Sequence, residues 1–163
     1  MPRRSAGIVP YRQKGGALEV LLGHPGGPFW RSRDLGAWSI LKGEYDPDES
    51  PEAAALREFT EETGWSLDVA LEPLGEVRQR SGKIVTAYAA RADFDVATLV
   101  SNTFEMEWPP HGGTLQRFPE IDRAQWFNLT DACARIVPGQ GAFLDRLAAG
   151  LGHVTAQGMP AHP

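Results

Sequence analysis

A helix framed by strong start and stop signals most constrains what this chain can fold into. Ser50 is a suitable N-cap, Pro51 suits the first helical position, and Gly64 follows the last turn. Between them, a run of alanines and Phe59 supply helix formers and an apolar stripe. The sequence therefore predicts a helix over residues 51–63 that buries one face.

Three glutamates share a second face of that helix. Glu58, Glu61 and Glu62 lie at positions i, i+3 and i+4, which about 3.6 residues per turn bring together. Their like charges repel, so a cation between them would stabilise the helix, and hard carboxylate oxygens suit Mg²⁺ or Mn²⁺. An acidic surface in which Arg57 pairs with Glu61 explains the same spacing. The three positions alone leave both interpretations open.

Residues on either side of the glutamates complete a longer pattern. The segment fits G-x5-E-x7-R-E-U-x-E-E-x-G-U, where U is a bulky apolar residue, at Gly43, Glu49, Arg57, Glu58, Phe59, Glu61, Glu62, Gly64 and Trp65. This pattern resembles the Nudix box, the signature of the Nudix hydrolases. Trp65 is the one departure, since that position more often holds an aliphatic residue. Agreement at so many fixed positions favours the metal-site interpretation.

The resemblance implies a fold and a chemistry. The expected fold is α+β, a Nudix-type α/β/α sandwich with a mixed β-sheet, in which the box forms a loop-helix-loop catalytic motif. The implied activity is Mg²⁺-dependent (or Mn²⁺-dependent) hydrolysis of a nucleoside diphosphate linked to another moiety, such as a (d)NTP, a dinucleoside polyphosphate or a nucleotide sugar. We expect one domain over residues 1–150 and a flexible tail over residues 151–163.

The resemblance also assigns metal ligands within the box. Glu58 and Glu62 are the expected ligands, and Glu61 is a further ligand or positions water. The main-chain carbonyl of Lys42 is expected to join the metal shell. Gly43 would let the backbone turn tightly and bring that carbonyl close to the metal.

Other residues are expected to brace the site or to move a proton. Arg57 and Glu49 would pair and hold the loop before the helix against it, and Gly64 would close the helix. The sequence leaves the general base open among four carboxylates: Glu61, Glu105, Glu107 and Glu120. Glu105 and Glu107 alternate on one face of a predicted strand and could point at the same site.

Substrate recognition is expected to come from outside the box. Trp30, Arg31 and Arg33 form an aromatic and basic loop that could stack on a base and clamp phosphate. Lys42 could also contact phosphate, as could Lys83 or Arg78. Residues 5–12 are similar to Nudix members that cleave dinucleoside polyphosphates or diphosphoinositol polyphosphates. No dense basic cluster is present, which favours nucleotide substrates. A nucleotide-sensing Nudix-fold module without catalysis is the alternative from another class.

Composition limits the partners. The chain has 163 residues and a net charge of -5, from 21 acidic and 16 basic residues. This balance lacks the basic footprint of a nucleic-acid-binding protein. Because no apolar run reaches the roughly 18 residues that span a bilayer, and no signal sequence is recognisable, we expect a cytoplasmic location without a membrane partner. The resemblance adds a homodimer as an expected assembly, and Cys133, the only cysteine, is expected to be buried.

The remaining pattern predicts strands and helices without regular βαβ alternation. Strands are expected at residues 6–12, 18–22, 38–41, 74–79, 83–92, 104–108 and 124–129; loops at 43–50 and 109–119; and helices at 131–136 and 142–149.

Overall fold

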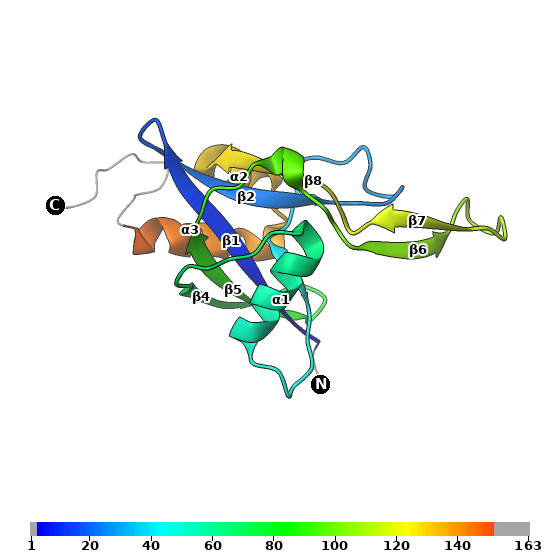
Figure 1. The fold of residues 1–163 in the computed structure, drawn as a ribbon, viewed down its shortest axis with the longest axis horizontal. Helices are drawn as coiled ribbons and strands as arrows, with labels where there is room; N and C mark the ends of the chain where they lie inside the picture. The colour runs from blue at the N-terminus through cyan, green and yellow to red at the C-terminus, as the bar shows by residue number, and fades with distance from the viewer. Residues whose placement is uncertain (1–2, 152–163) are drawn as a thin grey trace.

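A computed structural model describes residues 3–151, and shows a central sheet with helices on both faces (Figure 1). The predicted tail beyond residue 151 lies outside the described residues. The strands are β1 (Arg4–Lys14), β2 (Ala17–Pro25), β3 (Leu41–Glu44), β4 (Glu72–Arg78), β5 (Ile84–Arg91), β6 (Thr103–Glu107), β7 (Leu115–Pro119) and β8 (Ile121–Asn128). The helices are α1 (Pro51–Thr63), α2 (Leu129–Arg135) and α3 (Gly141–Gly150), with short 3₁₀ turns at Val96–Thr98 and Pro138–Gln140.

The main sheet is mixed. Its strand order is β4-β5-β1-β2-β8, and β3 also pairs with β1. β1 runs parallel to β5 and antiparallel to β2 and β3. Helix α1 covers one face, while α2 and α3 cover the other. The predicted α/β/α sandwich with a mixed sheet is therefore confirmed.

Both faces of β1 are buried, because its side chains alternate between two apolar clusters. Ala6 and Ile8 pack with Phe59 of α1, whereas Val9 and Tyr11 belong to the cluster under α2 and α3. At about 25 cal/mol per Å² of buried apolar surface, these two layers supply the main driving force for folding. β1, which pairs with β3 at the start of the box, is thus packed on both of its faces.

Helix α1 has the predicted bounds. The Ser50 hydroxyl accepts a hydrogen bond from the Ala53 N–H at 3.1 Å, and Gly64 adopts a left-handed conformation with φ of 76°. Trp65, which departs from the family pattern, packs inside: its ring stacks on Phe94 at 4.7 Å between centroids. A large aromatic side chain therefore fits at this position.

Three local predictions are wrong. The strand expected at residues 38–41 lies instead at Leu41–Glu44, because these residues pair with β1, while Trp38 and Ser39 form only isolated bridges. This strand also includes the first two residues of the loop expected at 43–50. The loop expected at residues 109–119 ends in strand β7, which pairs with β6. Cys133 is exposed, because it lies on the outer side of α2.

Strands β6 and β7 form a separate ribbon that projects from the body of the molecule (Figure 1). Trp108, just beyond β6, meets Phe29 edge-to-face at 5.4 Å between ring centroids. The ribbon therefore packs on the loop that follows β2. Among residues 3–151, no helix combines the length and the apolar character needed to span a membrane.

Candidate active site

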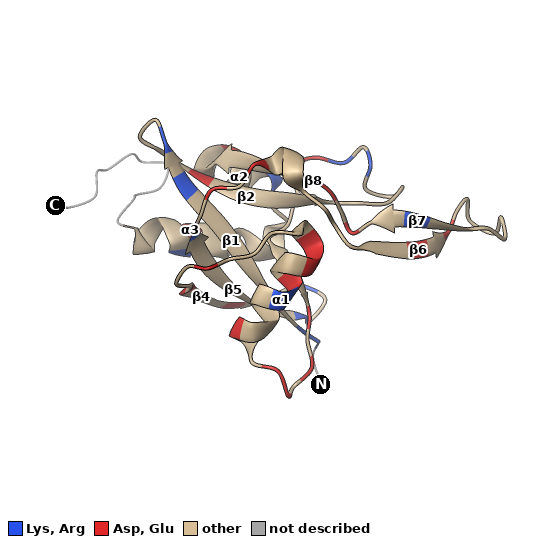
Figure 2. Ribbon diagram, viewed as in Figure 1, with Lys and Arg blue, Asp and Glu red and all other residues tan. Residues whose placement is uncertain are grey.

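The box helix lies against β3 with almost no space between them. An added Cβ on Gly43 would collide with the carboxylate of Glu58. The glycine therefore provides the room that the Glu58 carboxylate occupies. Figure 2 shows the acidic residues of α1 with a basic residue between them.

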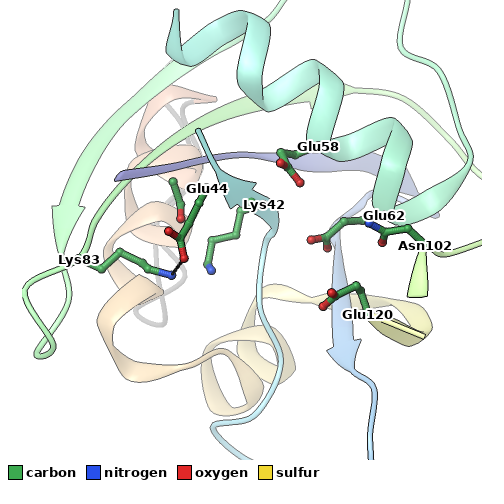
Figure 3. Close-up of a pocket in the computed structure, with 9 residues that line it drawn as sticks. Lys42, Glu44, Glu58, Glu62, Lys83, Asn102 and Glu120 are labelled. Carbon is green, nitrogen blue, oxygen red and sulfur yellow. Dashed lines mark hydrogen bonds and ion pairs between the residues drawn. The ribbon is translucent and has the colours of Figure 1, made fainter. Parts of the chain in front are cut away.

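A polar pocket of about 340 Å³ opens beside this contact. Helix α1 contributes Glu58 and Glu62, and Glu120 faces them from the segment before β8 (Figure 3). Lys42 of β3 points into the same space. The full lining is Ser5, Lys42, Gly43, Glu44, Glu58, Glu62, Lys83, Asn102 and Glu120.

The carboxyl groups on the acidic side of this pocket have raised pKa values. Burial raises the pKa of Glu62 to about 8, and the charges of Glu58 and Glu120 add to this effect. Burial also raises the pKa of Glu58 and that of Glu120. Withdrawal from water and mutual repulsion both disfavour the carboxylate anions, so a cation bound here would relieve an existing electrostatic cost.

The opposite side of the pocket is basic. The Lys42 side chain lies over Gly7, where an added Cβ would meet the Lys42 Cβ at 2.6 Å. Lys83 reaches the same pocket and pairs with Glu44 at 3.5 Å. Burial lowers the pKa of Lys42, and the charge of Lys83 lowers it further. The two ammonium groups are therefore close enough to repel each other.

Arg57 connects the loop before α1 with the pocket. Its guanidinium donates two hydrogen bonds to Glu49, at 2.8 and 2.9 Å, and a third to Glu58 at 2.8 Å. A longer contact of 3.3 Å reaches Glu61. Hydrogen bonds to Glu49 are the main reason that the pKa of Arg57 is raised. The planar guanidinium of Arg57 thus holds one carboxylate oxygen of Glu58 from outside the pocket.

The residues of the pocket fit a hard divalent cation. Among residues 3–151, no three acidic, His or Cys side chains are already drawn together as a metal-ligand cluster. The donors nevertheless match: carboxylates from two segments line one wall, and the close approach at Gly43 leaves no side chain between β3 and Glu58. Mg²⁺ binds through only one or two carboxylates together with substrate phosphate and water. Glu58 and Glu62 are suited to hold such an ion, and Glu120 faces them in the same pocket.

Several carboxylates considered from the sequence lie away from the pocket lining. Glu61 is exposed on α1 beside Arg57. Glu105 pairs with Arg117 across the ribbon at 3.2 Å, and Glu107 accepts a hydrogen bond from the His111 N–H at 2.9 Å. The ribbon therefore carries both glutamates away from Glu58 and Glu62.

The aromatic and basic loop is also outside the pocket lining. Trp30 is half-exposed, and the guanidinium of Arg33 lies 5.5 Å from its ring centroid. Arg31 is exposed on the same loop. His24 holds the loop in place, since its ring bonds to the Arg33 carbonyl and to Asp122. Of the residues predicted to contact phosphate, Lys42 and Lys83 line the pocket, whereas Arg78 is outside its lining.

The sequence interpretation did not single out Asn102, Glu44 or the Ser5 side chain as site residues. Asn102 reaches the pocket because its N–H donates to the Glu61 carbonyl at 3.0 Å, while its carbonyl accepts from the Glu120 N–H at 2.8 Å. These contacts join segments that are about 20 to 40 residues apart in the chain. No local pattern marks them, because only the folded chain brings them together.

Known proteins are similar to this chain in sequence and in fold. The family model of the NUDIX domain matches residues 1–147. Nudix hydrolase 21, chloroplastic, of Arabidopsis thaliana is 33% identical over 134 residues, which are 80% of this chain and 58% of that protein. RNA pyrophosphohydrolase of Erythrobacter litoralis (strain HTCC2594) is 51% identical over 39 residues, 24% of each chain. Both matches span less than two thirds of the relative's own length.

A solved structure agrees over nearly the whole chain. The C. elegans Ap4A hydrolase binary complex superposes with a TM-score of 0.60 at 25% identity, covering 91% of this chain and 97% of that one. Together with the family match, this agreement defines the class. The chain belongs to the Nudix hydrolase family.

Proposed function

We propose that this chain is a Mg²⁺-dependent pyrophosphohydrolase that acts on a small nucleotide: a (d)NTP, a dinucleoside polyphosphate or a nucleotide sugar. One observation carries the proposal. A single pocket has Glu58, Glu62 and Glu120 on one side and Lys42 and Lys83 on the other. Carboxylates attract a divalent cation and ammonium groups attract phosphate, so the pocket suits a metal–diphosphate pair.

Each residue has a proposed role in this reaction. Glu58 and Glu62 would hold the ion, and the Lys42 carbonyl would be a further ligand. When bound, the ion would act as a Lewis acid. Its charge would offset the charge of the diphosphate, and it would lower the pKa of a bound water. Arg57, anchored by Glu49, holds Glu58 in place through a direct hydrogen bond, and the exposed Glu61 is a further carboxylate that could orient water.

We assign the general base to Glu120 rather than to Glu107. Glu120 lines the pocket, and burial raises the pKa of its carboxyl, which makes the carboxylate a better proton acceptor. In the proposed step, a water oxygen attacks one phosphorus, the P–O bond to the leaving phosphate breaks, and the water proton passes to Glu120. Trp30, Arg31 and Arg33 would contact the rest of the substrate, beyond the pocket.

A release assay tests the proposed function. Wild type, Glu62→Gln and the exposed control Glu52→Gln are assayed with ATP, dATP, a dinucleoside polyphosphate and a nucleotide sugar, each with Mg²⁺ and with Mn²⁺. Wild type and Glu52→Gln should cleave at least one substrate, while Glu62→Gln loses about 100-fold or more in kcat, because a metal ligand is gone. Failure of wild type to cleave any of them would reject the proposal. Binding without cleavage would instead support a nucleotide-sensing module.

A further inference from the structure

Ser5 is a buried polar residue that the proposed mechanism does not use. Ser5 is among the residues that line the pocket, yet it is 0% exposed. Its hydroxyl has no hydrogen-bond partner within the described part of the chain. Burying a hydroxyl without a partner costs about 1–3 kcal/mol. Such a group points to a partner that arrives from the pocket.

The sheet places this hydroxyl between the two lysines. At this end of the sheet, β1 lies between β3 and β5, with Ser5 opposite Glu44 on one side and Val85 on the other. Lys42 lies two residues before Glu44 in β3, so strand alternation puts its side chain on the same face as Ser5. Lys83 lies just before β5, and it lines the same pocket (Figure 3). Because Gly7 has no Cβ, the Lys42 side chain can lie directly beside it.

This arrangement suits an anion with several oxygens. Lys42 and Lys83 line one pocket, where their like charges repel each other, and an anion between them removes that repulsion. A phosphoryl group has oxygens enough to accept from both ammonium groups and from a hydroxyl at once. A carboxylate has only two, and the Glu44 carboxylate already pairs with Lys83 at the edge of the pocket.

We propose that Ser5 is a phosphate ligand, whose Oγ donates a hydrogen bond to a non-bridging oxygen of the phosphoryl group held between Lys42 and Lys83. The inference rests on the proposed function and adds a binding residue to it. The hydroxyl stays without a partner in the free protein and gains one only in the complex. Ser5 therefore contributes to affinity for the substrate and not to stability of the free fold.

Binding of methylenediphosphonate, a diphosphate analogue that resists hydrolysis, tests the role of Ser5. Its affinity is measured by calorimetry with saturating Mg²⁺ for wild type, Ser5→Ala and Ser5→Cys, and the melting temperature is measured without ligand. Both variants should bind about tenfold or more weakly, because a hydrogen bond to a charged oxygen is lost. Ser5→Ala should melt at the wild-type temperature or above it, since it removes an unsatisfied group. KM for a cleaved nucleotide should rise in parallel.

Ser39 offers a matched control. Its hydroxyl is already satisfied, donating to the Ile40 carbonyl at 2.7 Å and accepting from the Gln140 side chain at 3.1 Å. Ser39→Ala should therefore lower the melting temperature and leave affinity for methylenediphosphonate unchanged.

The outcomes separate this inference from the proposed function. Wild-type affinity in Ser5→Ala overturns the inference, and a lowered melting temperature with unchanged affinity identifies a structural hydroxyl instead. A wild-type chain that binds the analogue but cleaves no nucleotide rejects the proposed hydrolysis alone. A wild-type chain that does not bind the analogue rejects both.

Discussion

Glu62 and Lys42 carry opposite charges in a pocket that withdraws both groups from water, which disfavours the charged form of each. Burial raises the pKa of Glu62 and lowers that of Lys42, so both groups shift toward their neutral forms. Their mutual attraction opposes these shifts without cancelling them. The free pocket is therefore electrostatically unfavourable, and binding of a cation and an anion together would relieve it.

This imbalance predicts a pH dependence of stability. Because the pKa of Glu62 is about 8 in the folded chain and about 4.5 in an unfolded reference, the folded state binds more protons between these values. Stability of the metal-free protein should therefore fall as pH rises from 5 to 8. Melting temperatures measured in EDTA at pH 6 and pH 8.5 test this, and Glu62→Gln should flatten the difference while Glu52→Gln keeps it. If the melting temperature changes equally between the two pH values in wild type and in Glu62→Gln, the raised pKa of Glu62 is contradicted.

The contact between α1 and β3 is the element that assembles the acidic wall. It depends on one missing side chain, because any Cβ at Gly43 would occupy the position of the Glu58 carboxylate. The backbone of Gly43 is not in the left-handed region, so an alanine would suit its conformation. The requirement for glycine here is one of space and not of backbone freedom.

Gly43→Ala should therefore act on metal binding through a collision. Displacing Glu58 should weaken Mg²⁺ affinity roughly tenfold or more, and overpacking should cost about 1–3 kcal/mol of unfolding free energy. Calorimetric titration with Mg²⁺ and chemical denaturation measure the two effects. Gly141→Ala is the control, since nothing lies within 4 Å of its added Cβ and alanine favours the helix. An unchanged Mg²⁺ affinity in Gly43→Ala would show that Glu58 does not need this space.

At the scale of the whole molecule, the pocket lies at the edge of a sheet whose two faces are covered. Phe59 fixes α1 to the sheet from within the box itself, and it is fully buried among Ile8, Leu41 and Trp65. The Asn102–Glu120 pairing closes the opposite side, at the base of the β6–β7 ribbon. Fold stability and pocket geometry thus depend on the same interface.

Phe59→Ala should remove much of that interface. Truncating a fully buried phenylalanine costs about 3–5 kcal/mol, so the midpoint of urea denaturation should fall clearly. Leu115→Ala, at a ribbon residue that is 66% exposed, should change the unfolding free energy by less than about 0.5 kcal/mol. Similar midpoints for the two variants would mean that α1 is not anchored through Phe59.

Local sequence signals were sufficient wherever the physics is local. Caps at Ser50 and Gly64 defined α1 to the residue, and the β-prone runs at residues 6–12 and 18–22 located β1 and β2. The same signals misplaced β3 and missed β7, since each of these short strands exists only because a partner strand accepts its hydrogen bonds.

The sequence by itself identified the fold family through its resemblance to the Nudix box. It also predicted a helix that presents three glutamates, because helical period and capping act within a few residues. Only the tertiary structure decided which carboxylates meet. Glu58 and Glu62 face Glu120, while Glu105 and Glu107 are carried off on the ribbon and Glu61 remains exposed beside Arg57. Long-range strand register also placed Ser5 between Lys42 and Lys83. Pairing between distant segments sets such proximity, and no local pattern in the chain encodes it.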